Sequence, residues 1–344
     1  MKHLIAIIGP TASGKSALAV SLARQFEGEV IACDSTQVYR GFDIGTAKPT
    51  REERGGIRHH LMDLIDPAEL FTAAEYRRRA LEVLADLRER GRLPIFTVGT
   101  GLYLRALLSG LSDAPARSIA LRARLGASDA RHGGVYLHDL LRRVDPAAAA
   151  RIDPRDRQKL VRALEIRFLA GKPLAEVYRA GRDPLEGYAS LKIGLNPPRA
   201  MLYERIETRV HTMLQQGWCD EVAALIAFSR RRESGLPVPL VFGPLSEPGT
   251  EAGFAPPVDE GQPSAPKPFE FIGYRELREH LENEKPLPET IAAIAQATRR
   301  YAKRQLTWFR KEPDVHWFTG FGDTPEIREG VAAAVERHLA GNPQ

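Results

Sequence analysis

The sequence predicts an α/β fold in which a doubly wound parallel sheet is interrupted by a small inserted helical domain. Three short apolar runs, at residues 3–8, 29–33 and 93–98, are typical of buried parallel strands, and helical patterns separate them. Strands that alternate with helices indicate a sheet covered by helices on both faces. From about residue 116 to about residue 190 the strand pattern disappears, and Arg, Ala and Leu dominate. This change in pattern indicates the inserted domain.

The elements of the core follow one another in chain order. The first apolar run ends at Gly9, and the next helix, over 14–25, places three apolar residues on one face: Leu18, Ala19 and Leu22. A long helix is predicted over 73–90, where a spacing of 3.6 residues relates Leu81, Leu84, Ala85 and Arg88. Gly91 ends that helix, and a shorter helix is predicted near 102–108. Helical patterns return at 199–230 and 287–312.

The domain boundaries are drawn from these patterns. Residues 1–115 and 191–344 are assigned to the α/β core with its C-terminal helices, and residues 116–190 to the inserted domain. Helices of the inserted domain are predicted near 117–125, 134–143, 146–151 and 156–170. The range 235–268 holds nine of the 25 prolines and five glycines with almost no hydrophobic periodicity. It is interpreted as a flexible loop within the core.

The composition narrows the class of protein. Hydrophobic residues make up 43% of the 344 residues, which predicts a globular chain. No apolar run approaches the roughly 20 residues that span a bilayer, so a cytoplasmic protein without membrane contact is expected. Cys33 and Cys219 have no partner at zinc-ligand spacing, and both are interpreted as buried free thiols. The net charge of +5 permits an anionic partner.

The motif GPTASGKS matches the phosphate-binding pattern Gly-x4-Gly-Lys-Ser, and it lies between a predicted strand and a predicted helix. In such a P-loop, glycines let successive backbone N–H groups point at phosphate oxygens, and the helix start adds its positive dipole end. The lysine supplies a mobile charge, and the serine hydroxyl can bind Mg²⁺. The candidate diphosphate- or nucleotide-binding residues are Gly9, Pro10, Thr11, Ala12, Ser13, Gly14, Lys15 and Ser16.

The motif alone does not identify the phosphate ligand. ATP is the usual ligand of such a loop, and a small-molecule or nucleotide kinase is therefore one hypothesis. An NTPase of this type carries an acidic residue after a later strand, but the strand 93–98 runs into Gly99-Thr100-Gly101. Asp34, at the end of the second strand, is the carboxylate placed near the loop. It is either a functional acid or a turn cap.

Seven motifs in the same order resemble the tRNA dimethylallyltransferase family, also called tRNA isopentenyltransferases or IPP transferases. They are GPTASGKS (9–16), DSTQVYRGFDIGTAKP (34–49), HHLMDLIDP (59–67), VGTGLYLRALLSGL (98–111), DPAAAARIDPRDRQKLVRALEI (145–166), IGYRELREHLE (272–282) and ATRRYAKRQLTWFRK (297–311). The resemblance covers nearly the whole chain apart from the Pro-rich stretch. It implies a P-loop NTPase-like fold and a Mg²⁺-dependent prenyltransferase.

The resemblance implies transfer of a dimethylallyl group from dimethylallyl diphosphate to N6 of the adenosine 3′-adjacent to the anticodon. By motif, Asp34 resembles the family's general base, Thr100 resembles a residue of the reaction channel, and Arg209 resembles an arginine that holds the diphosphate. Ser16 is the candidate Mg²⁺ ligand. A prenyltransferase that acts on free adenine nucleotides is a related alternative, and a non-enzymatic RNA-binding protein is a third. Nothing in the sequence requires a dimer, so a monomer is expected.

The resemblance also implies contacts with the anticodon stem-loop of tRNA. Basic residues interleave with aromatic residues in 297–311, a composition that suits phosphates and stacked bases. The alternative for this segment is a solvated helix with Trp308 in the core. His59 and His60 are interpreted as structural. The residues that match tRNA-contacting positions are Asp34, Ser35, Thr36, Gln37, Thr100, Arg122, Gln158, Lys159, Leu160, Val161, Arg162, Glu270, Phe271, Ile272, Gly273, Tyr274, Arg275, Lys303, Arg304, Gln305, Leu306, Thr307, Trp308, Phe309 and Arg310.

Overall fold

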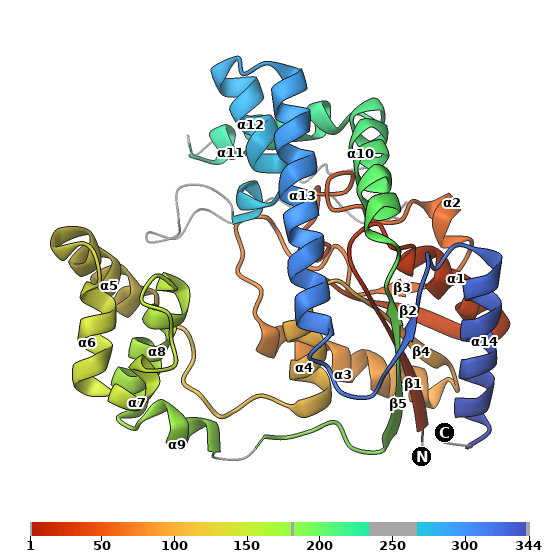
Figure 1. Cartoon of the computed structure of the whole chain (residues 1–344), viewed down its shortest axis with the longest axis horizontal. Coiled ribbons are helices and arrows are strands. Elements are labelled where there is room, and N and C mark those ends of the chain that lie inside the picture. The colour runs from red at the N-terminus through yellow and green to blue at the C-terminus, as the bar shows by residue number, and fades with distance from the viewer. Residues whose placement is uncertain (1, 180–181, 234–266, 342–344) are drawn as a thin grey trace. The chain divides into compact units, whose positions relative to one another are not determined.

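The computed structural model describes residues 2–179, 182–233 and 267–341 (Figure 1). Within them, six parallel strands form one sheet in the order β3-β2-β4-β1-β5-β6. The strands are β1 (Lys2–Ile8), β2 (Gly28–Cys33), β3 (His59–His60), β4 (Leu93–Val98), β5 (Tyr188–Leu195) and β6 (Val315–Phe318). Leu4 to Ile8 are buried, because β1 lies inside the sheet and is covered on both faces. The predicted α/β fold class is confirmed.

Helices cover both faces of the sheet. On one face, α1 (Lys15–Gln25) and α14 (Pro325–Leu339) pack Leu18, Leu22 and Val331 against Ile5 and Ile7. Figure 1 shows α3 (Ala73–Glu89) and α4 (Gly101–Ser109) on the opposite side. Their rings of Tyr76 and Tyr103 stack with centroids 4.5 Å apart. The remaining helices of this unit are α2 (Arg51–Arg54), α10 (Arg199–Gln215), α11 (Trp218–Glu233), the 3₁₀ helix η1 (Lys267–Glu270), α12 (Tyr274–Asn283) and α13 (Leu287–Phe309).

Two sequence interpretations of the core need correction. The strands β3, β5 and β6 were not predicted, and β5 includes residues 188–190, which the sequence assigned to the inserted domain. The predicted buried face of α3 was also wrong in part. Leu84 is buried, but Ala85 and Arg88 are exposed, and the buried face instead carries Tyr76, Arg77, Ala80, Leu84 and Leu87. Tyr76 and Arg77 are not simple apolar markers, so the hydrophobic pattern missed them.

The chain divides into two compact units, Met1–Arg105 with Gly187–Gln344, and Ala106–Glu186. The second unit is helical, and its core includes Leu125, Leu141 and Leu164. Its helices are α5 (Ile119–His132), α6 (Tyr136–Val144), α7 (Pro146–Ala149), α8 (Arg157–Ala170) and α9 (Leu174–Arg179). This unit begins earlier than residue 116, because residues 108–112 pair with residues 182–185. Leu185 N–H donates to Leu108 O, and a β-bridge joins Ser112 to Arg182.

The Pro/Gly-rich loop predicted over 235–268 lies outside the described residues, except that 267 and 268 begin η1. Cys33 is buried and free, and burial raises the pKa of its thiol. Cys219 is free but only partly buried, so the expectation of two buried thiols was half right. No helix in the described part of the chain is long and apolar enough to cross a membrane.

Candidate functional site

The phosphate loop joins the carboxyl end of β1 to the start of α1. Gly14 has φ of +85°, in the left-handed region that favours glycine. A Cβ at Gly14 would lie 2.8 Å from both Asp323 Oδ1 and the backbone nitrogen of Gly322, so another residue would also clash. Gly322 donates its N–H to Ser13 O at 2.9 Å. The segment after β6 therefore supports the loop from outside, and the loop requires glycine at this turn.

The ammonium group of Lys15 contacts the backbone of the loop. Its Nζ donates to Gly9 O at 2.9 Å and to Pro10 O at 2.7 Å. Burial lowers the pKa of Lys15 to about 7, with Arg209 adding to the decrease and Asp34 opposing it. The buried Ser13 Oγ has no hydrogen-bond partner among the described residues. An anion bound in this loop would favour the charged form of Lys15.

Asp34 follows the last residue of β2, and its carboxylate is oriented by its neighbours. Thr36 donates to Asp34 Oδ1 from its backbone N–H at 2.9 Å and from its hydroxyl at 2.7 Å. Oδ2 lies against Gly99, where a Cβ would come within 1.9 Å of it. Among the described residues, Oδ2 accepts no hydrogen bond, so one carboxylate oxygen is held while the other remains available.

The register of the sheet brings these segments to one edge. In β4, Val98 pairs with both Ile8 of β1 and Cys33 of β2. The residues that come directly after these three, Gly99, Gly9 and Asp34, therefore lie at the same edge of the sheet. Thr100 N–H donates to Cys33 O at 3.0 Å. Its hydroxyl accepts from Ser35 N–H at 3.0 Å and donates to Ser35 Oγ at 3.2 Å. The structure thus brings Asp34 to the same edge as the loop, as the sequence predicts, and Thr100 lies beside them.

Arg209, on α10, completes the cationic side of this edge. Its Nη1 donates to Thr11 Oγ1 at 3.3 Å. Burial lowers the pKa of Arg209, but a guanidinium remains protonated in proteins. The edge therefore places a lysine and an arginine against a glycine-containing loop and an oriented carboxylate.

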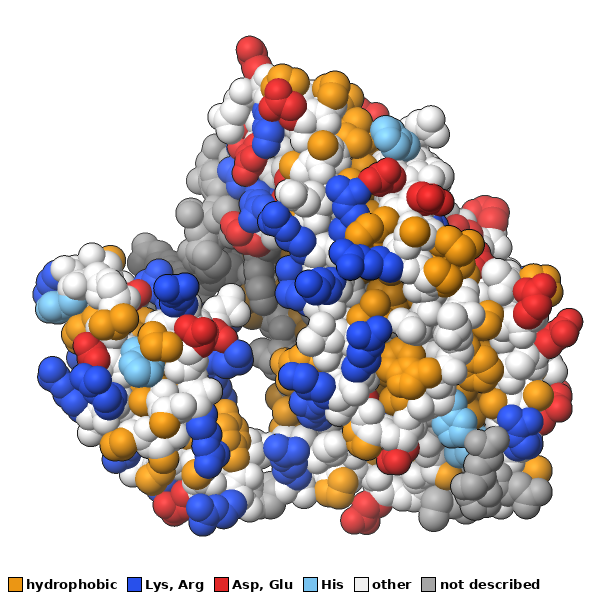
Figure 2. Space-filling model, in the orientation of Figure 1, with side chains coloured by type: hydrophobic (Ala, Val, Ile, Leu, Met, Phe, Trp, Pro, Cys, Tyr) orange, Lys and Arg blue, Asp and Glu red, His pale blue; other side chains and the backbone are white. Residues whose placement is uncertain are grey.

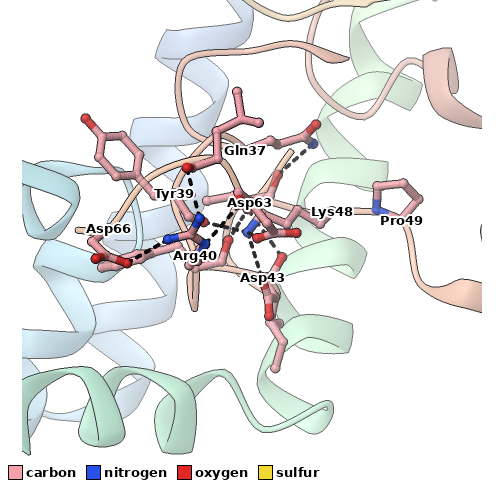
Figure 3. Close-up of polar contacts among 12 residues, drawn as sticks. Gln37, Tyr39, Arg40, Asp43, Lys48, Pro49, Asp63 and Asp66 are labelled. Carbon is pink, nitrogen blue, oxygen red and sulfur yellow. Dashed lines mark hydrogen bonds and ion pairs between the residues drawn. The ribbon is translucent and has the colours of Figure 1, made fainter. Parts of the chain in front are cut away.

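The segment after Asp34 is fixed by a buried lysine that the sequence interpretation did not single out (Figure 3). The side chain of Lys48 is fully buried, and its Nζ donates to Tyr39 O at 2.6 Å. It also pairs with Asp43 at 2.7 Å and with Asp63. Three parts of the chain between 39 and 63 thus meet at one ammonium group. A lysine next to a proline is typical of the protein surface, so no sequence pattern indicated that Lys48 is buried.

Glu221, on α11, holds the same segment from the other side. Its carboxylate accepts backbone N–H groups of Asp43 and Ile44 at 2.9 and 2.7 Å, and a longer one from Gly45 at 3.3 Å. The hydroxyl of Tyr274 donates to it at 2.6 Å. Burial raises the pKa of Glu221, and the four donors oppose that increase. Sequence reasoning missed Glu221, because its partners are distant in the sequence: the three backbone groups are 176 to 178 residues away and Tyr274 is 53 residues away.

The exposed face of α13 forms a basic pocket of about 380 Å³. Figure 2 shows Lys and Arg side chains gathered over this helix. Trp308 is 38% exposed, which excludes the alternative that it lies in the core. The guanidinium of Arg105, from α4, lies 4.7 Å from the centroid of the Trp308 ring. The pocket is lined by Arg105, Lys303, Arg304, Thr307, Trp308 and Lys311.

Several residues that match tRNA-contacting positions are instead buried, which corrects the interpretation of their side chains. Phe309 is 1% exposed and Leu160 is 2% exposed, and both pack in cores. Tyr274 is fully buried on Glu221, and Gly273 lies against Trp218, where a Cβ would clash. Gln305 is 5% exposed and bonds inside the protein. Periodicity alone could not separate the inner from the outer side of these segments.

In the helical unit, two arginines that match tRNA-contacting positions contact the buried carboxylate of Glu165. Arg122 makes a bidentate contact with Glu165, at 2.8 and 2.7 Å. Arg162 Nη1 contacts Glu165 at 2.7 Å, and Ser118 N–H donates to it at 2.7 Å. Burial alone would raise the pKa of Glu165, but these donors together lower it to about 2. Gln158 and Lys159 are exposed on α8, the helix that also carries Arg162 and Glu165.

Replacing Glu165 with glutamine should destabilise the helical unit by about 2 kcal/mol. Removing one partner of a fully buried ion pair typically costs about 3–5 kcal/mol, but the side chains of Arg122 and Arg162 stay 25% and 33% exposed and can be hydrated. Urea denaturation of the full chain measures the change. The matched control, Glu176→Gln, alters an exposed pair with Lys172 and should change stability by less than about 0.5 kcal/mol. Equal effects of the two variants would contradict a structural role for Glu165.

The donor groups at the loop fit a Mg²⁺ ion that is shared with a phosphate ligand. Ser16 lies exposed in the first turn of α1, beside Lys15. In the described part of the chain, no group of three or more His, Cys, Asp and Glu residues could hold a metal ion. Mg²⁺ usually keeps several waters and binds through one or two protein oxygens plus phosphates. A single hydroxyl at the loop suits that mode of binding.

The sheet order, the Gly-rich loop after β1 and the carboxylate after β2 define a P-loop α/β protein. The chain belongs to the IPP transferase family, whose model matches residues 37–312. It is 47% identical over 336 residues to a tRNA dimethylallyltransferase of Solibacter usitatus, covering 98% of this chain and 99% of the relative. It is 45% identical over 324 residues to one of Koribacter versatilis, covering 94% and 95%.

Solved structures are similar over the same length. The full-length tRNA isopentenylpyrophosphate transferase of Bacillus halodurans is 35% identical, with a TM-score of 0.63 over 99% of this chain and 97% of that chain. A eukaryotic dimethylallyltransferase acting on tRNA is 26% identical, with a TM-score of 0.76 over all of this chain and 81% of that chain. The resemblance in sequence motifs therefore extends to the fold.

Proposed function

We infer that this chain transfers a dimethylallyl group from dimethylallyl diphosphate to the exocyclic N6 of the adenosine 3′-adjacent to the anticodon in tRNA. Diphosphate is released. One observation carries the inference: the phosphate loop, Asp34 and Thr100 meet at a single sheet edge in a chain of the IPP transferase family. A monomer suffices for this assignment, because one chain supplies all these residues. We place the reaction in the cytoplasm with its tRNA substrate.

The reaction exchanges one bond for another. The bond between the allylic carbon and the diphosphate oxygen breaks, and its electron pair leaves with the diphosphate. The N6 lone pair forms the new carbon–nitrogen bond, and N6 loses one proton. That lone pair is delocalised into the adenine ring, so the amine is a weak nucleophile. Catalysis therefore needs an acceptor for the proton and a cationic cradle for the leaving group.

The residues of the edge suit these two tasks. Asp34 Oδ2 is available to accept the N6 proton, while Thr36 holds Oδ1 and fixes the orientation of the carboxylate. Lys15, the loop N–H groups and Arg209 would stabilise the charge that develops on the diphosphate. Mg²⁺ held by Ser16 and phosphate oxygens would supply further charge neutralisation. Thr100, bonded to Ser35, would line the passage between base and prenyl group.

Both units offer contacts for the nucleic acid. A target base must leave the stack of the anticodon loop, and contacts with neighbouring nucleotides offset that cost of a few kcal/mol. The basic pocket on α13 presents Lys303, Arg304 and the exposed ring of Trp308. In the helical unit, Arg122 and Arg162 remain partly exposed although Glu165 holds them. Such groups suit phosphates and unstacked bases.

The test is to incubate the protein with dimethylallyl diphosphate, Mg²⁺ and tRNA that lacks the modification. Mass analysis of the digested tRNA should show adenosine that has gained one C5H8 unit. Free AMP in a parallel reaction distinguishes the related prenyltransferase, and ATP with a small-molecule acceptor distinguishes a kinase. A gain only on AMP, or only phosphorylation, would contradict the inference.

The Arg304→Ala variant should bind tRNA more weakly and with a shallower salt dependence. Arg304 is exposed in the basic pocket, and each lost phosphate contact reduces the slope of log affinity against log salt by about 1. Filter binding or fluorescence anisotropy at several salt concentrations measures the slope. Arg337→Ala, on the exposed face of α14, is the matched control and should leave the slope unchanged. An unaltered slope for Arg304→Ala would exclude a phosphate contact.

A further inference from the structure

Gln305 joins two parts of the site that are far apart in the sequence. It lies on α13 and is only 5% exposed. Its Oε1 accepts the backbone N–H of Thr11, in the phosphate loop, at 2.8 Å. Its Nε2 donates to Gly99 O, at the end of β4, at 2.9 Å. These partners fix which way the Gln305 amide points. The N–H of Thr11 requires the amide oxygen, and the carbonyl of Gly99 requires the amide NH₂.

Each partner of Gln305 leads to a different functional group. The hydroxyl of Thr11 also accepts a hydrogen bond from Arg209. The loop is therefore held at Thr11 through both the backbone and the side chain of that residue. Gly99 donates its N–H to Cys33 O at 3.0 Å and packs against the Asp34 carboxylate. The amide of Gln305 therefore spans from the phosphate cradle to the backbone that supports the carboxylate.

We propose that Gln305 is a positioning residue that sets the distance between the phosphate loop and Asp34, and that it makes no contact with tRNA. This inference rests on the proposed function of the site. Transfer requires the allylic carbon, held through its diphosphate, to lie within reach of N6, whose proton goes to Asp34. Misplacing reacting groups by about 1 Å can reduce a rate about 10²-fold. A single amide that spans both groups controls this distance.

The exposure of α13 supports the same division of roles. Lys303, Arg304, Thr307 and Trp308 face outward, whereas Ala302, Gln305 and Phe309 face inward. Both polar atoms of the Gln305 amide are already paired inside the protein. Tyr301 supports the same carbonyl through a longer contact, from its hydroxyl to Gly99 O at 3.4 Å. The outer face of the helix is thus free for nucleic acid while its inner face organises the catalytic edge.

The Gln305→Glu variant tests the proposal through a pH profile. A protonated glutamic acid can accept from Thr11 N–H and donate to Gly99 O, as glutamine does. An ionised carboxylate still accepts from Thr11 but turns a negative oxygen toward the carbonyl of Gly99. The ratio of kcat for Gln305→Glu to kcat for the wild type should therefore rise about 10-fold or more as pH falls from about 8.5 to about 5.5. A purely space-filling role predicts a constant ratio.

Two further variants complete the design. Gln305→Leu loses both bonds and should reduce kcat by about 10- to 100-fold at every pH, with unchanged tRNA affinity. Gln296→Glu places the same chemical change on the exposed face of α13, and its kcat ratio should not vary with pH. Circular dichroism confirms folding, and if Gln305→Leu does not fold, the pH profile of Gln305→Glu still decides.

The outcomes separate this inference from the proposed function. Absence of C5 transfer by the wild type would overturn the proposed function itself. Transfer by the wild type, together with a pH-independent ratio for Gln305→Glu, would overturn the role of Gln305. Weaker tRNA binding with normal kcat at saturating tRNA would also overturn it, because a nucleic-acid contact would then explain the residue.

Discussion

The Asp34→Asn variant is expected to lose prenyl transfer by about 10²- to 10⁴-fold while it still binds tRNA. Asparagine keeps an oxygen that can accept both bonds from Thr36, so the local structure should persist. It cannot accept the proton that N6 must release. Single-turnover incorporation of the C5 unit measures the chemical step, and a tRNA binding assay measures the affinity.

The control for Asp34→Asn is Asp86→Asn. Asp86 lies near the end of α3, is paired with Arg90 and is largely exposed. Arg90 in turn contacts Glu29, near the amino end of β2, so Asp86 belongs to the opposite edge of the sheet. Its replacement should leave transfer within about twofold of the wild type. Near-normal turnover by Asp34→Asn would remove Asp34 as the proton acceptor.

The Lys15→Met variant is expected to reduce transfer by about 10²- to 10³-fold and to weaken binding of diphosphate. Methionine keeps the length of the aliphatic chain but removes the charge that faces the leaving group. The loop itself should survive, because Gly14 and the Gly322 N–H to Ser13 contact support it independently. Calorimetric titration with inorganic diphosphate and Mg²⁺ measures the affinity. Unchanged affinity and rate would exclude Lys15 from the cradle.

The lowered pKa of Lys15 makes a second readout available for the same residue. With a pKa of about 7, only about one-tenth of the free side chain is charged at about pH 8. A bound diphosphate favours the ammonium and raises that pKa, so binding should take up a proton, and affinity should fall as pH rises above about 7. Titrations in two buffers with different ionisation enthalpies report the uptake. Lys15→Arg stays charged throughout, so its difference from the wild type isolates this proton.

The sequence predicted those parts of the fold whose signals are local. The run from Leu4 to Ile8 is continuous and apolar because β1 is buried on both faces, and the glycine after it marks the loop. By contrast, β5 contains Lys192, whose side chain is buried and donates from Nζ to Pro313 O at 3.0 Å. A charged residue interrupts the apolar pattern, and only the tertiary partner explains its place in a strand.

The residues of the site also fall into two groups, those with a local sequence signal and those whose position depends on tertiary contacts. Lys15 lies in a short motif and Asp34 directly follows a strand, so sequence patterns brought both to attention. Lys48, Glu221 and Gln305 act through partners that the fold brings near, and Gln305 bonds Thr11 across 294 positions. The periodicity of α13 marked a basic aromatic helix but not which residues turn inward. Burial of polar groups is decided by tertiary contacts that no local pattern contains.

The contact between Gly322 N–H and Ser13 O also sets an order for the biosynthesis of the protein. The phosphate loop is synthesised before its supports, because Gln305 follows Thr11 by 294 positions and Gly322 comes later still. The nascent chain therefore carries an incomplete cradle until Gln305 and Gly322 have been synthesised. A chain truncated before residue 305 would lack both supports, and we expect it to be inactive.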